Sequence, residues 1–427
     1  MPSPSGAERG VPPTDARARF LAAESLGDLR RAVRDWLEAE LPAAWVAAVH
    51  AGEQERLRAA RAGLDEARWW AAMAACGLAV PTWPVAYGGL GMGAEQAGTI
   101  GAALRDYKTP RSRNPIGLNM VAPALLRWGS EEQRHRYLPG IASQQQIWCQ
   151  LFSEPGAGSD LASLATRAER RGDGWVVSGQ KVWTSLGHLA SMGLLLARTD
   201  PEVPKHAGIS VFCVPMSSPG VTVRPLRQIT GDAEFNEVFL DEVEVPDGDR
   251  LGGLGEGWSI ARRVLAHERV SDSGAGVLPG VIAGRSVAEL IRRYGESVDP
   301  QSRHRLARAW IDEEALRLTI ERSRQARAGD GTARVDGAVT KMLRTAHSQA
   351  LQDLALDLDG TDAVAWADDD RWRANTAWSY LRVQARSIAG GTSQITRNVI
   401  GERVLGLPRE PSADRDVPWN RVRRSGP

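Results

Sequence analysis

The chain has 427 residues, of which 42% are hydrophobic and 25% are charged, a composition typical of a soluble globular protein. This length exceeds one ordinary hydrophobic core and predicts two or three subdomains. The 53 basic and 52 acidic residues leave a formal net charge of +1, which argues against a protein that binds nucleic acid or an anionic membrane.

The first half of the chain is predicted to be helical after a disordered start. Residues 1–24 are expected to form a disordered N-terminus, because they begin with a stretch rich in Pro, Ser and Gly that has no apolar core. Residues 25–145 form the next segment, and their apolar side chains recur at helical spacing, as at Leu29, Val33 and Trp36. We therefore expect an N-terminal helical domain.

The spacing of the apolar residues then changes from a helical to a strand-like pattern. Residues 146–256 contain short β-rich runs bounded by Gly, Pro and Asp, which predict a central β-domain with strands at residues 175–179, 193–197, 209–214, 221–223 and 236–240. Residues 257–410 are again rich in Ala, Leu and Arg and predict a C-terminal helical bundle, followed by a tail at 411–427. The predicted fold class is therefore α+β.

Other features of the chain limit where the protein is located and what chemistry it performs. The spacing of Cys76, Cys149 and Cys213 fits neither a zinc site nor a disulfide framework, so we expect buried free thiols and no metal site. The N-terminal residues match neither a signal peptide nor a transit peptide. No apolar run reaches the roughly 18 residues that a membrane span needs. We expect a cytoplasmic protein without membrane insertion.

Two motifs lie close together near the middle of the chain. Residues 150–160, QLFSEPGAGSD, place glycines and small hydroxyl side chains in a turn, where backbone N–H groups can approach an anionic group closely. Residues 179–185, GQKVWTS, place a large aromatic ring beside two hydroxyl donors, which suits a flat cofactor ring with polar edges. Together, at this spacing, the two motifs resemble the flavin-binding signature of the acyl-CoA dehydrogenases.

This resemblance extends from about residue 25 to the ending ERVLGLPRE at residues 402–410. It implies the acyl-CoA dehydrogenase fold, with a helical domain, a central β-domain and a helical bundle, and it implies bound FAD. In this family a base removes the α-proton of an acyl thioester while FAD accepts the β-hydrogen as hydride, which gives a 2,3-enoyl thioester.

The resemblance also implies cofactor-binding roles for residues in the two motifs. Phe152 and Ser153 would lie along the edge of the flavin ring, and Ser159 would bond the pyrophosphate. Trp183 would pack against the isoalloxazine, and Ser185 would offer its hydroxyl near N5. The full set expected from these motifs is Gln150, Phe152, Ser153, Ser159, Trp183 and Ser185.

In this family a neighbouring subunit completes the flavin site. The run RRYG that begins at Arg292 corresponds imperfectly to the family's Arg-x-Phe-Gly stretch. The run GTDA that begins at Gly360 corresponds to its Gly-x-x-Gly, with Ala363 in place of the second glycine. Thr392 and Gln394 match the family's adenosine-side contacts better. We therefore expect a homodimer or a homotetramer.

The catalytic base is expected on a helix rather than in the usual loop. Many members of the family carry a glutamate two residues before the Thr of a Gly-Thr-Ser segment, but this chain has Gly390 there. On a helix from about Trp258, Glu268 shares an apolar stripe with Val264 and Leu265, and burial raises the pKa of a carboxylate toward the range useful to a base. In the isovaleryl-type branch the glutamate sits on this helix. Gly390 keeps an N–H that can donate to the thioester carbonyl.

Two other functions stay open at this point. A flavin monooxygenase on the same fold would need access for oxygen and no α-proton base. A catalytically silent partner subunit of a hetero-oligomer would explain the altered residues Tyr294 and Ala363. For the dehydrogenase, the expected partners are an acyl-CoA or acyl-carrier thioester as substrate and an electron-transfer flavoprotein or a similar acceptor.

Overall fold

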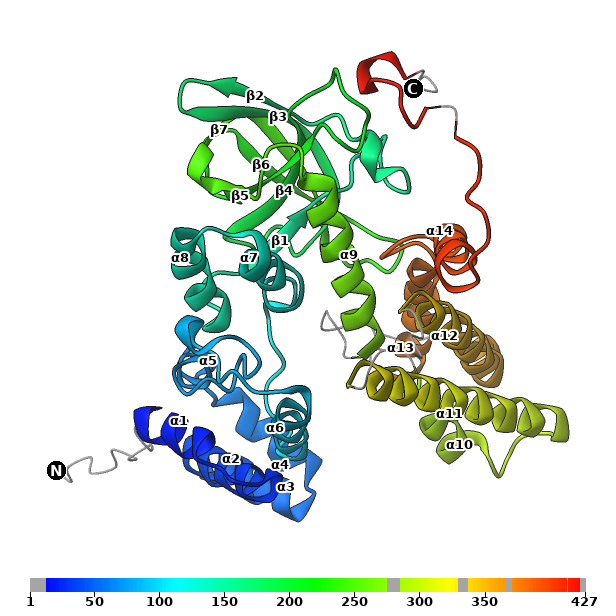
Figure 1. Ribbon diagram of the computed structural model, residues 1–427. Helices are drawn as coiled ribbons and strands as arrows, with labels where there is room; N and C mark the ends of the chain where they lie inside the picture. Colours follow the sequence, from blue (N-terminus) through cyan, green and yellow to red (C-terminus); the bar gives the residue numbers. More distant parts are fainter. Residues whose placement is uncertain (1–12, 275–284, 329–336, 366–370, 413, 423–427) are drawn as a thin grey trace. The chain divides into compact units, whose positions relative to one another are not determined.

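The chain divides into a helical unit and a unit that contains both a sheet and helices. The computed structural model describes residues 13–274, 285–328, 337–365, 371–412 and 414–422. Unit 1 comprises residues 1–118 and 129–147, and unit 2 comprises residues 119–128 and 148–427. Figure 1 shows unit 1 as helical, whereas unit 2 contains a β-sheet followed by helices.

Unit 1 is built on helices, and those between residues 16 and 107 share one apolar core. Ser25 caps the second helix by accepting a hydrogen bond from the N–H of Asp28, and Leu29, Val33 and Trp36 of that helix are buried, as their spacing predicted. The helices of this unit are α1 (Pro13–Leu21), α2 (Leu26–Glu40), α3 (Ala43–Ala51), α4 (Gln54–Ala62), α5 (Glu66–Ala75), α6 (Ala94–Asp106) and α8 (Glu131–Ala142).

Helix α1 corrects the prediction of disorder up to residue 24. Residues 13–21 are helical, and Ala16 and Phe20, four positions apart, are buried in the core of unit 1. The Pro-rich stretch before this short helix led to the prediction of disorder, although Ala16 and Phe20 have helical spacing. Residues 1–12 lie outside the described part of the chain.

Unit 2 contains an eight-stranded sheet in the order β6-β7-β3-β2-β4-β5-β8, with β1 parallel to β4. The predicted strands all fall within observed strands, and their inward side chains, among them Val177, Leu195 and Phe212, form the core of the sheet. The strands are β1 (Trp148–Leu151), β2 (Arg167–Arg171), β3 (Gly174–Ser185), β4 (Met192–Arg198), β5 (Ile209–Pro215), β6 (Val221–Leu226), β7 (Phe235–Pro246) and β8 (Arg250–Leu251).

The rest of unit 2 is helical, which confirms the predicted α+β class with its helical C-terminal part. Helices α10, α11 and α12 share a small apolar core that includes Val287, Leu306 and Leu354. The helices are α7 (Ala122–Trp128), α9 (Gly257–Gly274), α10 (Val287–Tyr294), α11 (Pro300–Ala328), α12 (Gly337–Asp359), α13 (Arg371–Val383) and α14 (Ser393–Val399).

The three cysteines are buried free thiols, as expected. Burial raises the pKa of Cys76 and of Cys149 to about 12, so both stay protonated at neutral pH. Within the described ranges, no helix combines the length and apolar character that a membrane crossing demands.

Candidate functional site

The turn after β1 lies beside the far part of β3. The N–H of Val182 donates to the carbonyl of Ser153 at 2.9 Å. The ammonium of Lys181 donates to the carbonyl of Phe152 at 3.1 Å. The structure therefore brings together the two sequence motifs that resemble a flavin site, with Gln150 on β1 directly before the turn.

Trp183 stands out from β3 at a break in the sheet. The register of β3 and β7 shifts between Lys181 and Thr184, and Trp183 has a φ of 60°, in the left-handed region that residues with side chains rarely adopt. Its side chain is 61% exposed, and it meets Phe235 edge-on with the ring centroids 6.0 Å apart. Backbone strain of this kind concentrates at functional sites. The bulge presents an indole on which a flat ring can stack.

The two hydroxyl side chains after Trp183 differ in exposure. Thr184 is completely buried, and its Oγ1 has no hydrogen-bond partner among the described residues. Ser185 is only half-buried. Ser185 is therefore the more accessible of the two hydroxyl groups, and its role near flavin N5 stays a prediction.

The glycine-rich turn presents its backbone to open space. Glu154 and Ala157 exchange two backbone hydrogen bonds of 3.1 Å, which close the turn. No atom lies within 4 Å of where a Cβ would stand at Gly156 or Gly158, and Ser159 is exposed. Backbone N–H groups and a hydroxyl in such a turn form a concave site for an anion, so the turn fits a pyrophosphate.

A buried ion pair anchors this turn to β3. Lys181 Nζ lies 2.8 Å from Glu154 Oε1, and the two side chains are 0% and 7% exposed. Glu154 also accepts hydrogen bonds from the N–H groups of Ala165 and Thr166. Burial by itself raises the pKa of Glu154, but Lys181 and the N–H donors outweigh burial and lower this pKa. Burial also lowers the pKa of Lys181, a shift that Glu154 opposes. Charge-assisted bonds thus hold the turn in place.

Trp183→Ala is expected to raise the dissociation constant of FAD about tenfold, because loss of an aromatic stacking partner costs roughly 0.5–1.5 kcal/mol beyond the lost contact area. Titration of the apoprotein with FAD, followed by flavin fluorescence, measures this constant. Trp310→Ala is the matched control, since Trp310 is 58% exposed on α11. Equal FAD affinity in both variants would contradict the role of Trp183.

A buried lysine holds the loop that contains Gly390. Gly390 and Gly391 have φ angles of 64° and 98°, which favour glycine. The buried ammonium of Lys341, on α12, donates to the carbonyl of Ala389 at 2.6 Å and also to the carbonyl of Gly391. This backbone suits glycine better than a glutamate.

The residues predicted to serve a neighbouring subunit fall into two groups. The hydroxyl of Tyr294, near Arg292 at the end of α10, donates to Asp359, which directly precedes Gly360. The structure therefore brings the two imperfect motifs together and turns Asp359 toward Tyr294.

Thr392 and Gln394 lie at the other end of the helical part. The hydroxyl of Thr392 caps α14 by accepting from the N–H of Ile395 at 3.2 Å. Gln394 is exposed in the first turn of α14. Their predicted contact with FAD stays a prediction.

The predicted helix around Glu268 is present as α9. Ile260, Ala261 and Val264 of this helix are completely buried, and Leu265 is half-buried. The backbone of Glu268 is helical, four positions after Val264, and its side chain lies outside the described residues.

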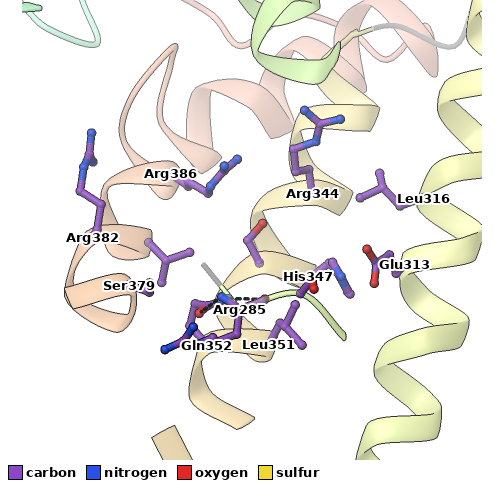
Figure 2. A pocket seen from close by; sticks show the side chains of 13 residues that line it. Arg285, Glu313, Leu316, Arg344, His347, Leu351, Gln352, Ser379, Arg382 and Arg386 are labelled. Carbon is purple, nitrogen blue, oxygen red and sulfur yellow. Dashed lines mark hydrogen bonds between the residues drawn. The ribbon is translucent and has the colours of Figure 1, made fainter. Parts of the chain in front are cut away.

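A basic pocket of about 240 Å³ lies among α11, α12 and α13 (Figure 2). Its lining includes Glu313, His347 and four arginines, Arg285, Arg344, Arg382 and Arg386. None of the residues predicted for the flavin site lines it. Arg382 also pairs with Glu234 at 3.0 Å and lies over the ring of Phe235, which contacts Trp183. One wall of the pocket is thus connected to the Trp183 bulge.

Comparison with known families assigns all three parts of the chain. The acyl-CoA dehydrogenase N-terminal domain matches residues 24–145, the middle domain matches residues 149–243, and the C-terminal domain matches residues 255–405. The chain belongs to the acyl-CoA dehydrogenase family. It is an FAD-dependent oxidoreductase, which confirms the predicted fold, enzyme class and cofactor.

Its relatives include mycobacterial dehydrogenases. The chain is 41% identical over 350 residues to acyl-CoA dehydrogenase FadE34 of Mycobacterium tuberculosis, a match that covers 82% of this chain but only 47% of FadE34. It is 38% identical over 391 residues to acyl-CoA dehydrogenase IpdE1 of the same organism, covering 91% and 99% of the two chains. Among solved structures, the Tcur3481-Tcur3483 steroid ACAD matches with a TM-score of 0.71 and 29% identity, covering 90% of this chain and 98% of that one.

Sequence reasoning missed the residues that support the site. Glu154 and Lys181 lie inside the two motifs, but a single acid and a single base 27 positions apart carry no pairing signal. The usable signal was a lysine within an apolar strand, since such a charge needs a partner. Arg198, almost completely buried at the end of β4, was also missed. It donates to backbone carbonyls, and the sequence carries no signal for such partners.

Proposed function

We propose that this chain oxidises the Cα–Cβ bond of an acyl thioester, with Glu268 as the base that removes the α-proton. The observation that supports this assignment is the buried stripe of α9, because residue 268 continues the helix face of Val264 by one turn. The loop that serves many relatives has Gly390 in place of an acid.

Each proposed residue has its own role in the reaction. Glu268 accepts the α-proton, and the N–H of Gly390 donates to the thioester carbonyl, which acidifies the α-carbon. FAD, when bound, would supply the hydride acceptor for the β-hydrogen, which leaves a double bond between the two carbons. Trp183 and the turn that ends at Ser159 orient the cofactor.

We propose a bulky, polycyclic, steroid-derived acyl-CoA as the substrate. The likeness to a structure named a steroid ACAD supports this class. A panel of straight, branched, aromatic and polycyclic acyl-CoAs with an artificial electron acceptor tests it. The kcat/KM of the polycyclic thioester is expected to exceed that of the straight-chain thioesters by about tenfold or more. A straight chain as the best substrate would contradict this proposal.

We propose that the chain works together with a second chain of the same family. One observation supports a hetero-oligomer over the homodimer or homotetramer predicted from the sequence: the name of the similar steroid ACAD joins two proteins. The chain spans about half the length of FadE34 and nearly the whole length of IpdE1. The proposed electron acceptor remains an electron-transfer flavoprotein or a similar protein.

A further inference from the structure

Residues 414–422, called the strap below, fold back onto the β-domain of the same unit (Figure 1, red end of the chain). The N–H of Trp419 donates to the carbonyl of Val203 at 2.9 Å, and Pro204 and Pro418 form an antiparallel β-bridge. The strap thus pairs with the loop between β4 and β5, far from it in the sequence.

The first anchor of the strap is a buried arginine. Arg198 is 3% exposed, and its guanidinium donates to the carbonyls of Ala162 at 2.6 Å and Leu164 at 3.2 Å. The indole of Trp419 lies 4.4 Å from that guanidinium, and its Nε1 donates to the carbonyl of Ser163 at 3.4 Å. Trp419 therefore covers the cation that fixes residues 162–164.

The second anchor is a shared lysine. Lys205 Nζ lies 3.0 Å from Asp160 and 2.8 Å from Asp414 of the strap. Hydrogen bonds from Lys205 and Ser412 lower the pKa of Asp414 to about 2, so Asp414 is ionised at neutral pH. Asp160 directly follows Ser159 in the glycine-rich turn. One ammonium group thus joins the turn to the strap.

We propose that the strap is a working part of the FAD site, and that it positions the turn at Ser159 for the cofactor's pyrophosphate. Both anchors act on residues 160–164, which continue the turn without a break. Trp419 and Asp414 act through Arg198 and Lys205 and are positioning residues. This inference rests on the assignment of the turn to the pyrophosphate in the proposed function.

The first test uses Trp419. Trp419→Ala removes the ring over Arg198 and is expected to raise the dissociation constant of FAD for the apoprotein about tenfold. Trp419→Phe keeps an aromatic face and is expected to stay within about threefold of the parent. Fluorescence titration of the apoprotein with FAD gives these constants, and its thermal midpoint shows whether the variants fold. Parent-like affinity in Trp419→Ala overturns the proposal.

The second test uses Asp414, where two effects have opposite signs. Asp414→Asn removes a negative charge near an anion site, so charge alone would tighten FAD binding. A weaker contact between Lys205 and residue 414 would weaken FAD binding. We expect weaker binding, by about threefold or more, because the ion pair between Lys205 and Asp414 becomes a weaker hydrogen bond to a neutral amide oxygen. Asp416→Asn is the matched control, since Asp416 is an exposed acid on the same strap. Tighter binding in Asp414→Asn would overturn the proposal.

A third variant separates failure of the strap from failure of the site. Ser159→Asp places a negative charge in the turn itself and is expected to weaken FAD binding more than Trp419→Ala does. If Ser159→Asp weakens FAD binding and both strap variants do not, the turn still holds the pyrophosphate, but the strap does not position it. If Ser159→Asp binds FAD like the parent, the turn does not hold the pyrophosphate, and both assignments fall.

Discussion

Glu268→Gln is expected to slow reduction of the bound flavin by substrate about 10²- to 10⁴-fold, the usual loss when a general base is removed, while FAD stays bound. The amide keeps the size of the side chain but has no basic oxygen. The segment GGTSQ at residues 390–394 contains no acid that could replace it. Stopped-flow absorbance of the flavin with an acyl-CoA substrate measures the rate, and the flavin spectrum reports occupancy.

The matched control is Glu296→Gln, an exposed acid after α10. It is expected to reduce flavin at the parent rate. If Glu268→Gln also reduces flavin within about threefold of the parent, far short of the range for a lost base, the base lies elsewhere. Such a result would favour the oxygenase alternative, which uses no α-proton base.

The fold could be predicted from local patterns. The strands at residues 193–197 and 209–214 are short β-rich runs between turn residues, and such runs form strands wherever the sheet buries them. The stripe that Val264, Leu265 and Glu268 share likewise predicted α9, because helical spacing places these residues on one face, and Val264 is completely buried there. Local pattern failed at α1, where Pro-rich composition outweighed the apolar pair Ala16 and Phe20.

The site could be predicted only in its local parts. The glycine-rich turn and Trp183 are short-range motifs, and the structure joins them through neighbouring strands. The contact between Lys205 and Asp414 spans 209 positions, and no local pattern carries that information. Its formation depends on how the whole unit folds. The supporting residues of a site are thus harder to find than the residues that face its cofactor.

Lys181→Met is expected to destabilise the protein by about 3–5 kcal/mol at pH 7, because it leaves Glu154 buried without its cation. The double variant Lys181→Met with Glu154→Leu is expected to regain most of this loss, since an apolar pair of similar volume needs no charge compensation. Lys108→Met is the surface control, because the side chain of Lys108 is exposed. Urea unfolding measures the free energy, and FAD titration shows whether the turn still binds the cofactor.

The stability that Lys181→Met costs depends on pH, and the pKa of Glu154 sets the direction of that dependence. In the parent, the pKa of Glu154 lies below its ordinary value of 4.5, so its contribution is present above that pH and is lost as the pH falls through the lowered pKa. In Lys181→Met, burial remains without the cation and raises the pKa of Glu154 above its unfolded value. The folded variant then takes up a proton as the pH falls from 7 toward 5, which stabilises it, while the parent changes little. The stability gap between the two should therefore narrow on acidification. A gap that stays constant between pH 7 and pH 5 would show that Lys181 supports the turn by packing rather than by charge.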